Sequence, residues 1–341
     1  MDGHRQPLRQ DRDSPLIRDF FEKERSSGRP LIAAIVIATQ GSTYRKPGAL
    51  MLFSARGERA GLLSGGCLEG DLKEHALRLL GSDSRCMVRA YDSRGSDDPV
   101  WGLGLGCEGL MQILLLKIDA DNDYEPLHSL LAAEFERRPA AFAIDIETGV
   151  FGSAPVATRS SLQGNIFTLV SERPPALLIC GAGPDAEPVA SLAVMLGWQV
   201  TVVDHRPAYV DARRFADNVR LSRVDATALG EQVMLDEFDA AVVMSHHLIA
   251  DGQYLAVLAA SAVPYVGLLG PAARRERLIA ELGDAGKPLR ARLRAPVGLD
   301  LGGRTPEAIA LSIIAEIQAF VHGRPGSPFS AKDHQGSLSP V

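Results

Sequence analysis

Residues 176–186 read ALLICGAGPDA, a short apolar run followed by a glycine-rich turn. The run before Gly181 is typical of a buried strand, and the residues after Gly183 favour a helix. A second apolar run ends at Asp204. In dinucleotide-binding folds a Gly-x-Gly turn joins the first strand to the first helix, and an acidic residue follows about 20 positions later. The spacing therefore predicts a Rossmann-type domain in the second half of the chain.

The rest of the second half alternates between strand and helix patterns. We expect strands at 176–180, 199–203, 240–245 and 265–269, and helices at 185–196, 248–260, 273–282 and 306–320. Such alternation predicts a doubly wound parallel sheet with helices on both faces. For the last helix, Thr305 is the expected N-cap and Pro306 the first helical residue.

The first half combines strands and helices in a less regular order, which is typical of an α+β domain. We expect helices at 14–24, 68–80 and 126–137, and strands at 31–39, 49–54, 59–63, 85–91, 110–117, 142–146, 152–158 and 165–169. The sequence SERPP at 171–175 is the best linker candidate. We therefore divide the chain into a disordered N-terminus (1–13), an α+β domain (14–172), a Rossmann-like domain (173–322) and a disordered tail (323–341).

Composition limits the possible functions. The 341 residues are 46% hydrophobic and 23% charged, which provides enough apolar material for two cores without disulfides or structural metals. A formal net charge of -6 provides no overall basic field for nucleic acid or an anionic membrane. The longest strictly apolar run, 31–38, is too short to span a bilayer, and residues 1–15 lack the apolar segment of a signal peptide. We therefore expect a soluble, cytoplasmic protein that binds neither nucleic acid nor membrane.

The glycine turn of the second half carries mixed signals for nucleotide binding. A diphosphate at this turn would gain from the positive end of the following helix dipole. However, Asp185 and Glu187 place two carboxylates there, and we expect them to satisfy the helix N-terminus themselves. Pro184 also removes one N–H donor. These residues favour a Rossmann fold without a standard NAD(P) role over a working dehydrogenase.

Two histidines, His246 and His247, follow the strand expected at 240–245. This places them at the carboxyl edge of the sheet, where open α/β folds bind ligands, although a pair on a solvated surface loop is the alternative. The candidate ligand-binding residues of this domain are Gly181, Gly183, Asp204, His246 and His247.

The first half carries three glycine-rich motifs. Residues 40–48 (QGSTYRKPG) join two expected strands and combine small residues, hydroxyls and cations. Residues 64–69 (SGGCLE) place Cys67 at a turn before a helix, where the dipole favours the thiolate and the glycines leave N–H groups free for an anion. Residues 101–109 (WGLGLGCEG) place Cys107 just before a strand. Because cysteines are often buried and glycines often form turns, ordinary packing is the alternative.

Seven stretches of the chain are long and unlike generic Rossmann signatures. They are GSTYRKPGA (41–49), SGGCLE (64–69), GLGLGCEG (102–109), CGAGPDAEP (180–188), VTVVDHRP (200–207), YVGLLGP (265–271) and GLDLGGRTPEAIALSIIAEI (298–317). In these stretches the chain resembles the XdhC/CoxI family, accessory proteins that mature xanthine dehydrogenase and related molybdenum hydroxylases. The resemblance covers residues 32–320. Many relatives carry a GAGHVG-like sequence where this chain has Gly-Ala-Gly-Pro-Asp-Ala, which weakens the expectation of nucleotide binding.

The resemblance implies a maturation factor rather than a catalyst. Such a protein binds the molybdenum cofactor (molybdopterin), supports exchange of its oxo ligand for sulfur by a partner cysteine desulfurase, and inserts it into a xanthine dehydrogenase-type molybdenum hydroxylase. Arg45 and Lys46 are expected to receive the cofactor's phosphate, and a thiolate of Cys67 or Cys107 is expected to lie near molybdenum. The candidate cofactor-binding residues of the first domain are Gly41, Ser42, Thr43, Arg45, Lys46, Ser64, Gly65, Gly66, Cys67, Glu69, Gly106 and Cys107.

Two other functions stay open. The Rossmann-like domain could serve an NAD(P)-dependent oxidoreductase through Gly181, Gly183 and Asp204. It could instead be a docking surface for the hydroxylase or for the sulfurase. The hydroxylase served also stays open among xanthine, aldehyde and carbon monoxide dehydrogenases. Because most soluble oligomers are twofold, we expect a homodimer.

Overall fold

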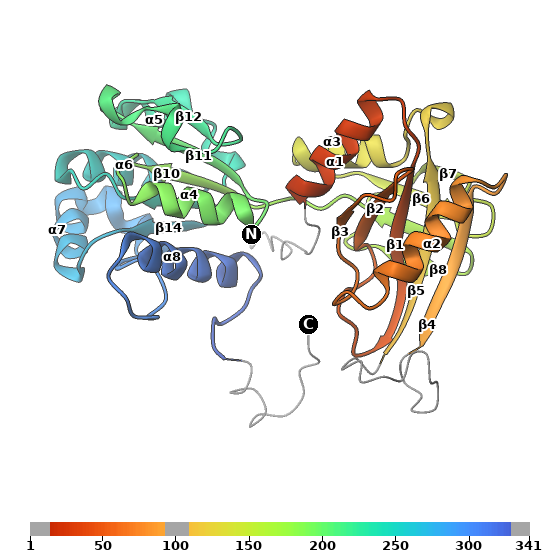
Figure 1. The fold of residues 1–341 in the computed structure, drawn as a ribbon. Coiled ribbons are helices and arrows are strands. Elements are labelled where there is room, and N and C mark those ends of the chain that lie inside the picture. The colour runs from red at the N-terminus through yellow and green to blue at the C-terminus, as the bar shows by residue number, and fades with distance from the viewer. Residues whose placement is uncertain (1–13, 93–108, 329–341) are drawn as a thin grey trace. The chain divides into compact units, whose positions relative to one another are not determined.

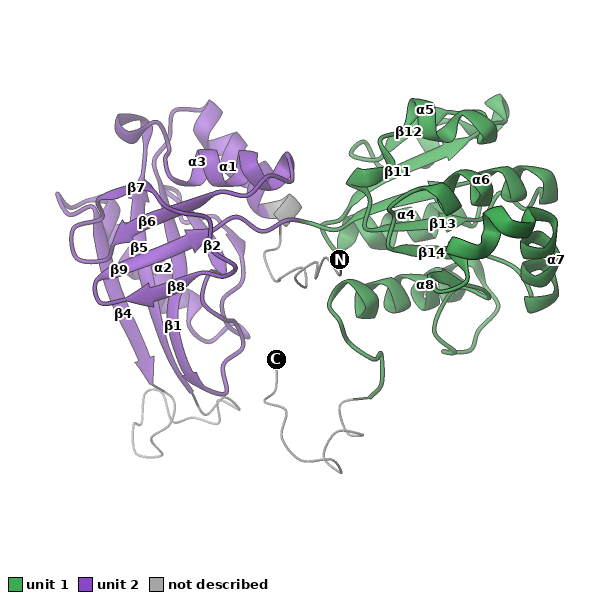
Figure 2. Ribbon diagram, turned by 180° about the vertical axis from the view of Figure 1, so that it is seen from behind, with its two compact units in different colours: residues 1–8, 174–338 green, residues 9–173, 339–341 purple. Residues whose placement is uncertain are grey.

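The computed structural model describes residues 14–92 and 109–328. The expected disorder of residues 1–13 and 329–341 lies outside these ranges, and residues 323–328 of the expected tail are described without helix or strand. The chain divides into two compact units between Arg173 and Pro174 (Figure 2). We call them the N-terminal unit (residues 14–173) and the C-terminal unit (residues 174–328).

The N-terminal unit is built on a five-stranded antiparallel sheet in the order β3-β2-β1-β5-β4 (Figure 1). Its strands are β1 (Leu31–Gly41), β2 (Leu50–Ser54), β3 (Arg59–Gly61), β4 (Cys86–Asp92) and β5 (Gly109–Ile118). Successive side chains of β1 alternate between two buried cores. The apolar run of this strand is continuous because both faces of the sheet are covered.

One of these cores contains α2 (Glu69–Leu80), which packs against one face of the sheet. The other contains α1 (Ser14–Ser26), α3 (Leu127–Phe135) and a four-stranded antiparallel sheet in the order β7-β6-β9-β8. The strands of this second sheet are β6 (Ala141–Asp145), β7 (Phe151–Ser153), β8 (Ser161–Gln163) and β9 (Ile166–Val170). The first sheet is therefore buried on both sides, and its loops and the start of α2 are left to form a site.

A six-stranded parallel sheet forms the centre of the C-terminal unit, in the order β12-β11-β10-β13-β14-β15. The strands are β10 (Ala176–Cys180), β11 (Gln199–Asp204), β12 (Arg220–Arg223), β13 (Ala240–Val243), β14 (Tyr265–Leu268) and β15 (Leu293–Arg294). Helices α4 (Ala186–Met195) and α8 (Pro306–Val321) belong to one core, and α5 (Leu229–Gln232), α6 (Leu248–Ala260) and α7 (Ala272–Leu282) to the other. This is the Rossmann strand order. From β10 the chain adds strands first on one side and then, beginning with β13, on the other, so the order reverses between β10 and β13.

The described residues also form short 3₁₀ helices: η1 (Ala120–Asn122), η2 (Pro207–Tyr209), η3 (Ala212–Arg214), η4 (Ala226–Ala228), η5 (Leu235–Glu237) and η6 (Gly283–Leu289). No helix within the described ranges is both long and apolar enough to cross a bilayer.

The structure confirms the predicted fold class, an α+β domain followed by a Rossmann-like parallel sheet. Thr305 caps α8 by accepting from Ala308 N–H at 3.2 Å, and Pro306 is the first helical residue, both as predicted. The sequence patterns do not predict β8, β12 and β15. These strands are short, and β12 (RLSR) lies at the sheet edge without an apolar pattern. The strand predicted at 59–63 already ends at Gly61, where φ is +88°.

Gly181 joins β10 to the glycine turn where no side chain fits. Its φ is +121°, and a Cβ atom there would lie 2.6 Å from both N and Cα of Ser245. We therefore expect Gly181→Ala to lower the free energy of unfolding of the C-terminal unit by about 3 kcal/mol, through backbone strain and overpacking. Urea-induced unfolding followed by circular dichroism measures the change.

The matched control is Gly252→Ala in α6. A Cβ atom there would meet Leu278 Cδ2 at 3.4 Å, an ordinary van der Waals distance. Alanine in a helix interior is favoured over glycine by about 1 kcal/mol, so this variant should be at least as stable as the wild type. Equal stability of the two variants would contradict the close approach at Gly181.

Candidate functional site

The loops of the N-terminal unit meet at one end of the five-stranded sheet. Strand β1 ends at Gly41, which pairs with Gly109 at the start of β5. The backbones approach so closely that a Cβ atom on Gly109 would lie 2.3 Å from Ser42 O. Arg45 Nε donates to Leu62 O at 3.1 Å and so ties the loop after β1 to the segment that leads into the second glycine motif. The first two motifs are therefore neighbours in the structure.

Other candidate residues of this region differ in their roles. Thr43 is buried, and its hydroxyl donates to Arg45 O at 3.0 Å, so it shapes the loop. Arg45 and Lys46 are half-buried. Gly106 and Cys107 lie outside the described residues, and their role in the site stays a prediction.

Residues 64–69, which we call the Cys67 turn, are held by hydrogen bonds around Ser64. The N–H and Oγ of Ser64 donate to the two carboxylate oxygens of Glu69 at 2.9 and 2.5 Å. The same Oγ accepts from the N–H groups of Gly66 and Leu68 at 3.3 and 3.2 Å. One serine side chain therefore fixes the course of the whole turn.

The turn presents its cysteine to solvent. Cys67 is an exposed free thiol, and the preceding Gly66 has a φ of +109°, a conformation that favours glycine. A Cβ atom on Gly65, Gly66 or Gly70 would meet nothing within 4 Å. The backbone on both sides of the thiol is thus open to a ligand.

The expectation that this turn leaves its N–H groups free is only partly correct. The N–H groups of Ser64, Gly66 and Leu68 are taken, because serine side chains bond readily to neighbouring backbone groups. The N–H groups of Gly65 and Cys67 have no acceptor among the described residues. Two donors therefore remain for an anion.

Glu69 is a buried anion at the start of α2. Its exposed fraction is 1%, and no cation of the described residues forms an ion pair with it. Burial opposes its ionisation, but hydrogen bonds from the side chain and backbone of Ser64 outweigh burial and hold the pKa of Glu69 below its usual value. The helix dipole also favours a negative charge at this end of α2.

A second polar cluster, which the sequence patterns do not predict, lies between α2 and β4. Tyr91 OH donates to Asp71 Oδ2 at 2.6 Å, and His75 Nε2 lies 3.5 Å from the same oxygen. Burial and the hydrogen bond to Asp71 raise the pKa of Tyr91, so the phenol stays protonated. Burial and the nearby Arg89 lower the pKa of His75, so its imidazole is neutral at pH 7. The i,i+4 spacing of Asp71 and His75 is the sequence signal for this cluster.

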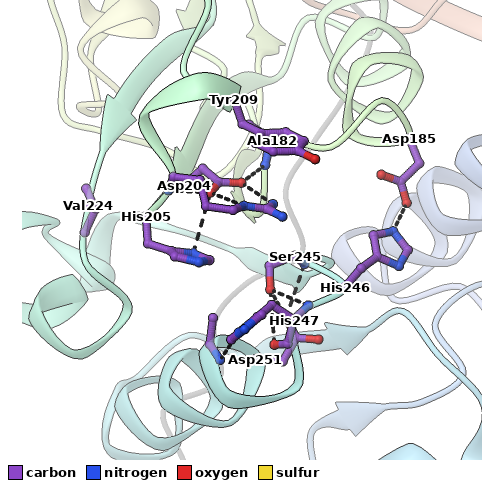
Figure 3. A network of polar contacts seen from close by, with 12 residues as sticks. Ala182, Asp185, Asp204, His205, Tyr209, Val224, Ser245, His246, His247 and Asp251 are labelled. Carbon is purple, nitrogen blue, oxygen red and sulfur yellow. Dashed lines mark hydrogen bonds and ion pairs between the residues drawn. The ribbon is translucent and has the colours of Figure 1, made fainter.

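In the C-terminal unit the glycine turn meets Asp204 where the strand order reverses (Figure 3). The buried carboxylate accepts from the N–H groups of Ala182 and Arg206 at 2.7 and 2.8 Å. The Arg206 guanidinium donates to it through Nε and Nη2 at 2.9 and 2.8 Å. Burial opposes the ionisation of Asp204, but these bonds outweigh it and lower the pKa of the carboxyl. Asp204 is therefore neutralised within the protein.

The two acidic residues at the start of α4 do not cap the helix, so that expectation is wrong. Asp185 makes no cap hydrogen bond, and its Oδ2 instead lies 2.5 Å from His246 Nε2. Its Oδ1 is buried without a partner among the described residues. Glu187 accepts from Arg214 Nε at 2.8 Å. Both carboxylates are thus bound to side chains, Asp185 to His246 and Glu187 to the Arg214 guanidinium.

The two candidate histidines have different roles. His246 has a φ of +58°, and its exposed side chain reaches Asp185 at the glycine turn (Figure 3). His247 Nδ1 accepts from Ala250 N–H at 3.3 Å and so caps α6. The His247 ring also packs against that of His205, with the ring centroids 5.7 Å apart. His246 therefore contacts the glycine turn, whereas His247 serves as the N-cap of α6.

A serine also holds the turn that carries these histidines. Ser245 N–H and Oγ donate to Asp251 Oδ1 at 3.2 and 2.5 Å, and the Oγ accepts from His247 N–H at 3.2 Å. Asp251 is fully buried, and Arg274 pairs with its other carboxylate oxygen. The sequence patterns do not predict that Asp251 holds this turn, because an acid in the first turn of a helix usually faces solvent.

Within residues 14–92 and 109–328, no three His, Cys, Asp or Glu side chains are grouped so that they could hold a metal ion. The structure brings Arg45 beside the segment that enters the Cys67 turn, and it places Asp185 and His246 together at the glycine turn. That Cys67 contacts a metal stays a prediction.

Comparisons with known proteins match both units. A family model described as the XdhC and CoxI family matches residues 25–92, and one described as the XdhC Rossmann domain matches residues 177–317. A Bacillus subtilis protein named as a probable xanthine dehydrogenase subunit is 36% identical over 313 residues, which cover 84% of this chain and 92% of that protein. The molybdenum cofactor insertion chaperone PaoD of Escherichia coli is 24% identical over 307 residues, 89% of this chain and 88% of PaoD.

A solved structure also resembles this chain over nearly its whole length. The crystal structure of a xanthine dehydrogenase from Bacillus halodurans superimposes with a TM-score of 0.75 at 28% identity. The superposition covers 92% of this chain and 98% of that chain.

The glycine turn of the C-terminal unit is a poor diphosphate site. Pro184 and Pro188 supply no N–H groups, the Ala186 N–H bonds to Gly183 O, and two carboxylates stand at this helix end. We therefore expect no saturable NADH binding with a Kd below about 1 mM, which corresponds to about 4 kcal/mol of binding free energy. Isothermal titration calorimetry measures it, with a known dinucleotide-binding protein as the positive control. A Kd in the micromolar range would contradict this interpretation.

The neutralised Asp204 predicts a pH dependence of stability. Because its folded pKa is lower than its unfolded value of about 3.9, it stabilises the fold above that pH, and this contribution is lost as the pH falls through the folded pKa. Asp204→Asn should therefore lose about 3 kcal/mol of unfolding free energy at pH 7 and much less near pH 3. Urea unfolding across this pH range tests it, with the exposed Asp300→Asn as control. An equal loss at both pH values would refute the linkage.

Proposed function

Because the chain belongs to the XdhC and CoxI family, we propose that it binds the molybdenum cofactor and delivers it to a molybdenum hydroxylase of the xanthine dehydrogenase type. The names of two relatives support this role, one a molybdenum cofactor insertion chaperone and the other a probable subunit of xanthine dehydrogenase. We further propose that the chain holds the cofactor while a partner cysteine desulfurase exchanges its oxo ligand for sulfur. The role is that of a carrier rather than a catalyst.

The observation that carries the proposal is the exposed thiol of Cys67 on a held turn with open backbone around it. The molybdenum cofactor is a pterin with an anionic phosphate and a dithiolene-bound metal. When bound, it supplies the metal centre that the hydroxylase later uses. A thiolate is a soft donor that suits a sulfur-binding metal. The missing side chains at Gly65 and Gly70 leave room for a flat ring system against the backbone.

The same region fits the anionic end of the cofactor. Arg45 and Lys46 bring two cations to the loop beside the Cys67 turn, and the N–H groups of Gly65 and Cys67 are available as donors. Cationic side chains and successive backbone N–H groups are the usual partners of phosphate. We propose that these four residues bind the phosphate. Cys107 is a second proposed thiol of the site.

An NAD(P)-dependent oxidoreductase is the alternative function, and the geometry of the C-terminal unit favours it less. Asp204, the acidic residue at the expected spacing, is paired with the Arg206 guanidinium and accepts from Ala182 N–H. The unit has the Rossmann strand order but offers few donors at its glycine turn. We propose instead that it contributes a surface for a protein partner. Assembly into a homodimer stays a prediction.

Purified chain mixed anaerobically with freshly released molybdenum cofactor and passed over gel filtration tests the proposal. We expect the wild type to retain about one molybdenum and one pterin per chain. Cys67→Ala should lower the affinity at least tenfold because the metal loses its thiolate, about 1.4 kcal/mol or more. Gly70→Leu should do so too, because the new side chain covers the backbone at a position where a Cβ atom meets nothing within 4 Å.

The control variant is Cys86→Ala. Cys86 is half-buried and its thiol contacts Ile146 O, so its loss should leave cofactor binding unchanged. Wild-type protein that retains no cofactor would refute the proposed function. Full binding by both Cys67→Ala and Gly70→Leu would show that the cofactor binds elsewhere on the chain.

A further inference from the structure

We propose that Ser64 and Glu69 are positioning residues for Cys67. They fix the shape of the Cys67 turn so that its thiol stays outside the protein and two specific N–H groups stay available. The expected effect on cofactor binding rests on the proposed function, because the Cys67 thiol is the group that would contact the cofactor. The structural part of the proposal, the order of Cys67, stands independently.

The Glu69 carboxylate is buried at the start of α2, although a helix can begin without a buried carboxylate. A carboxylate that leaves water is destabilised unless its oxygens are hydrogen-bonded or paired. Glu69 is 1% exposed, and its two oxygens accept from the N–H and the hydroxyl of Ser64. A helix end needs no such buried charge, because a solvent-exposed Ser, Thr or Asp at the N-cap satisfies it. Here the N-cap is Leu68, which makes no side-chain cap bond.

The buried pair fixes the backbone around Cys67. Glu69 accepts the Ser64 hydroxyl hydrogen, which leaves the oxygen lone pairs of Ser64 for Gly66 N–H and Leu68 N–H. These two N–H groups flank Cys67 on either side in the sequence. The backbone at Cys67 is therefore held before and after the thiol, while the N–H groups of Gly65 and Cys67 keep no acceptor among the described residues.

The C-terminal unit uses the same arrangement. Ser245 donates its N–H and hydroxyl to the buried Asp251, and its Oγ accepts from His247 N–H. The residue held in this way is the exposed His246. In both units a serine in the loop between a strand and the next helix bonds to a buried acid of that helix, and the loop carries a side chain that faces outward. Two occurrences on unrelated sheets indicate that the arrangement serves to present a side chain.

The test attaches a nitroxide spin label to Cys67 in a chain that also carries Cys86→Ala and Cys107→Ser, because Cys86 is a second free thiol that is only half-buried. In the wild-type turn we expect the broad spectrum of an ordered label. Ser64→Ala should narrow it at least twofold in central line width, and Ser64→Thr, which keeps the hydroxyl, should restore the broad spectrum. Hydrogen exchange at Gly66 and Leu68 should accelerate at least tenfold in Ser64→Ala, while the interior of α2 stays protected. Where Ser64→Ala does not fold, Glu69→Gln, which keeps size and one acceptor oxygen, replaces it.

The second readout is cofactor affinity of the unlabelled proteins. Positioning predicts at least a tenfold loss for folded Ser64→Ala and recovery in Ser64→Thr. An unchanged spectrum in Ser64→Ala overturns the proposal, and so does a mobile label with undiminished cofactor affinity. Wild-type protein that binds no cofactor overturns the proposed function instead. The spin-label spectra then still decide whether Ser64 and Glu69 order Cys67.

Discussion

The pairing of β1 with β5 is the constraint on which the N-terminal site depends. These neighbours in the sheet come from distant parts of the chain, with Leu31 opposite Ile118. All three glycine motifs of the unit lie between these two residues in the sequence. A register shift between Val36 and Ala38 sets which residues of β1 lie opposite the start of β5. The relative position of the loops is therefore a property of the whole sheet.

Buried acids have a common role in the two units. Glu69, Asp204 and Asp251 have exposed fractions of 1% or less, and each accepts from at least one backbone N–H. A buried carboxylate requires donors at fixed positions around its oxygens, so it determines the backbone geometry near it. In each case the acid holds the backbone of a turn, and beside Glu69 and Asp251 the exposed residues are Cys67 and His246. These three buried carboxylates therefore fix the shape of the backbone and are not themselves exposed to a ligand.

The sequence predicts the fold well because its signals are local. The apolar runs, the glycine turn at Gly181 and the spacing to Asp204 all lie within a few tens of residues. The exposure of Cys67 also follows from its glycine neighbours. The burial of Glu69 does not, since an acid at a helix start normally faces water. The contact of Asp185 with His246 joins residues 61 positions apart and exists only because β10 and β13 are neighbours in the sheet. The ion pair between Asp204 and Arg206 could have been predicted from the sequence, because the two residues are only two positions apart.

His246 lies in the left-handed region of backbone conformation, where its Cβ makes the chain less stable by about 1–2 kcal/mol. Glycine would adopt the same conformation without that strain. The C-terminal unit is therefore less stable than a chain with glycine at this position would be, and it keeps an imidazole there at the mouth of its glycine turn. Selection for heat resistance alone would remove this side chain early. A more thermostable descendant of this protein would then lose the imidazole that contacts Asp185 at the glycine turn.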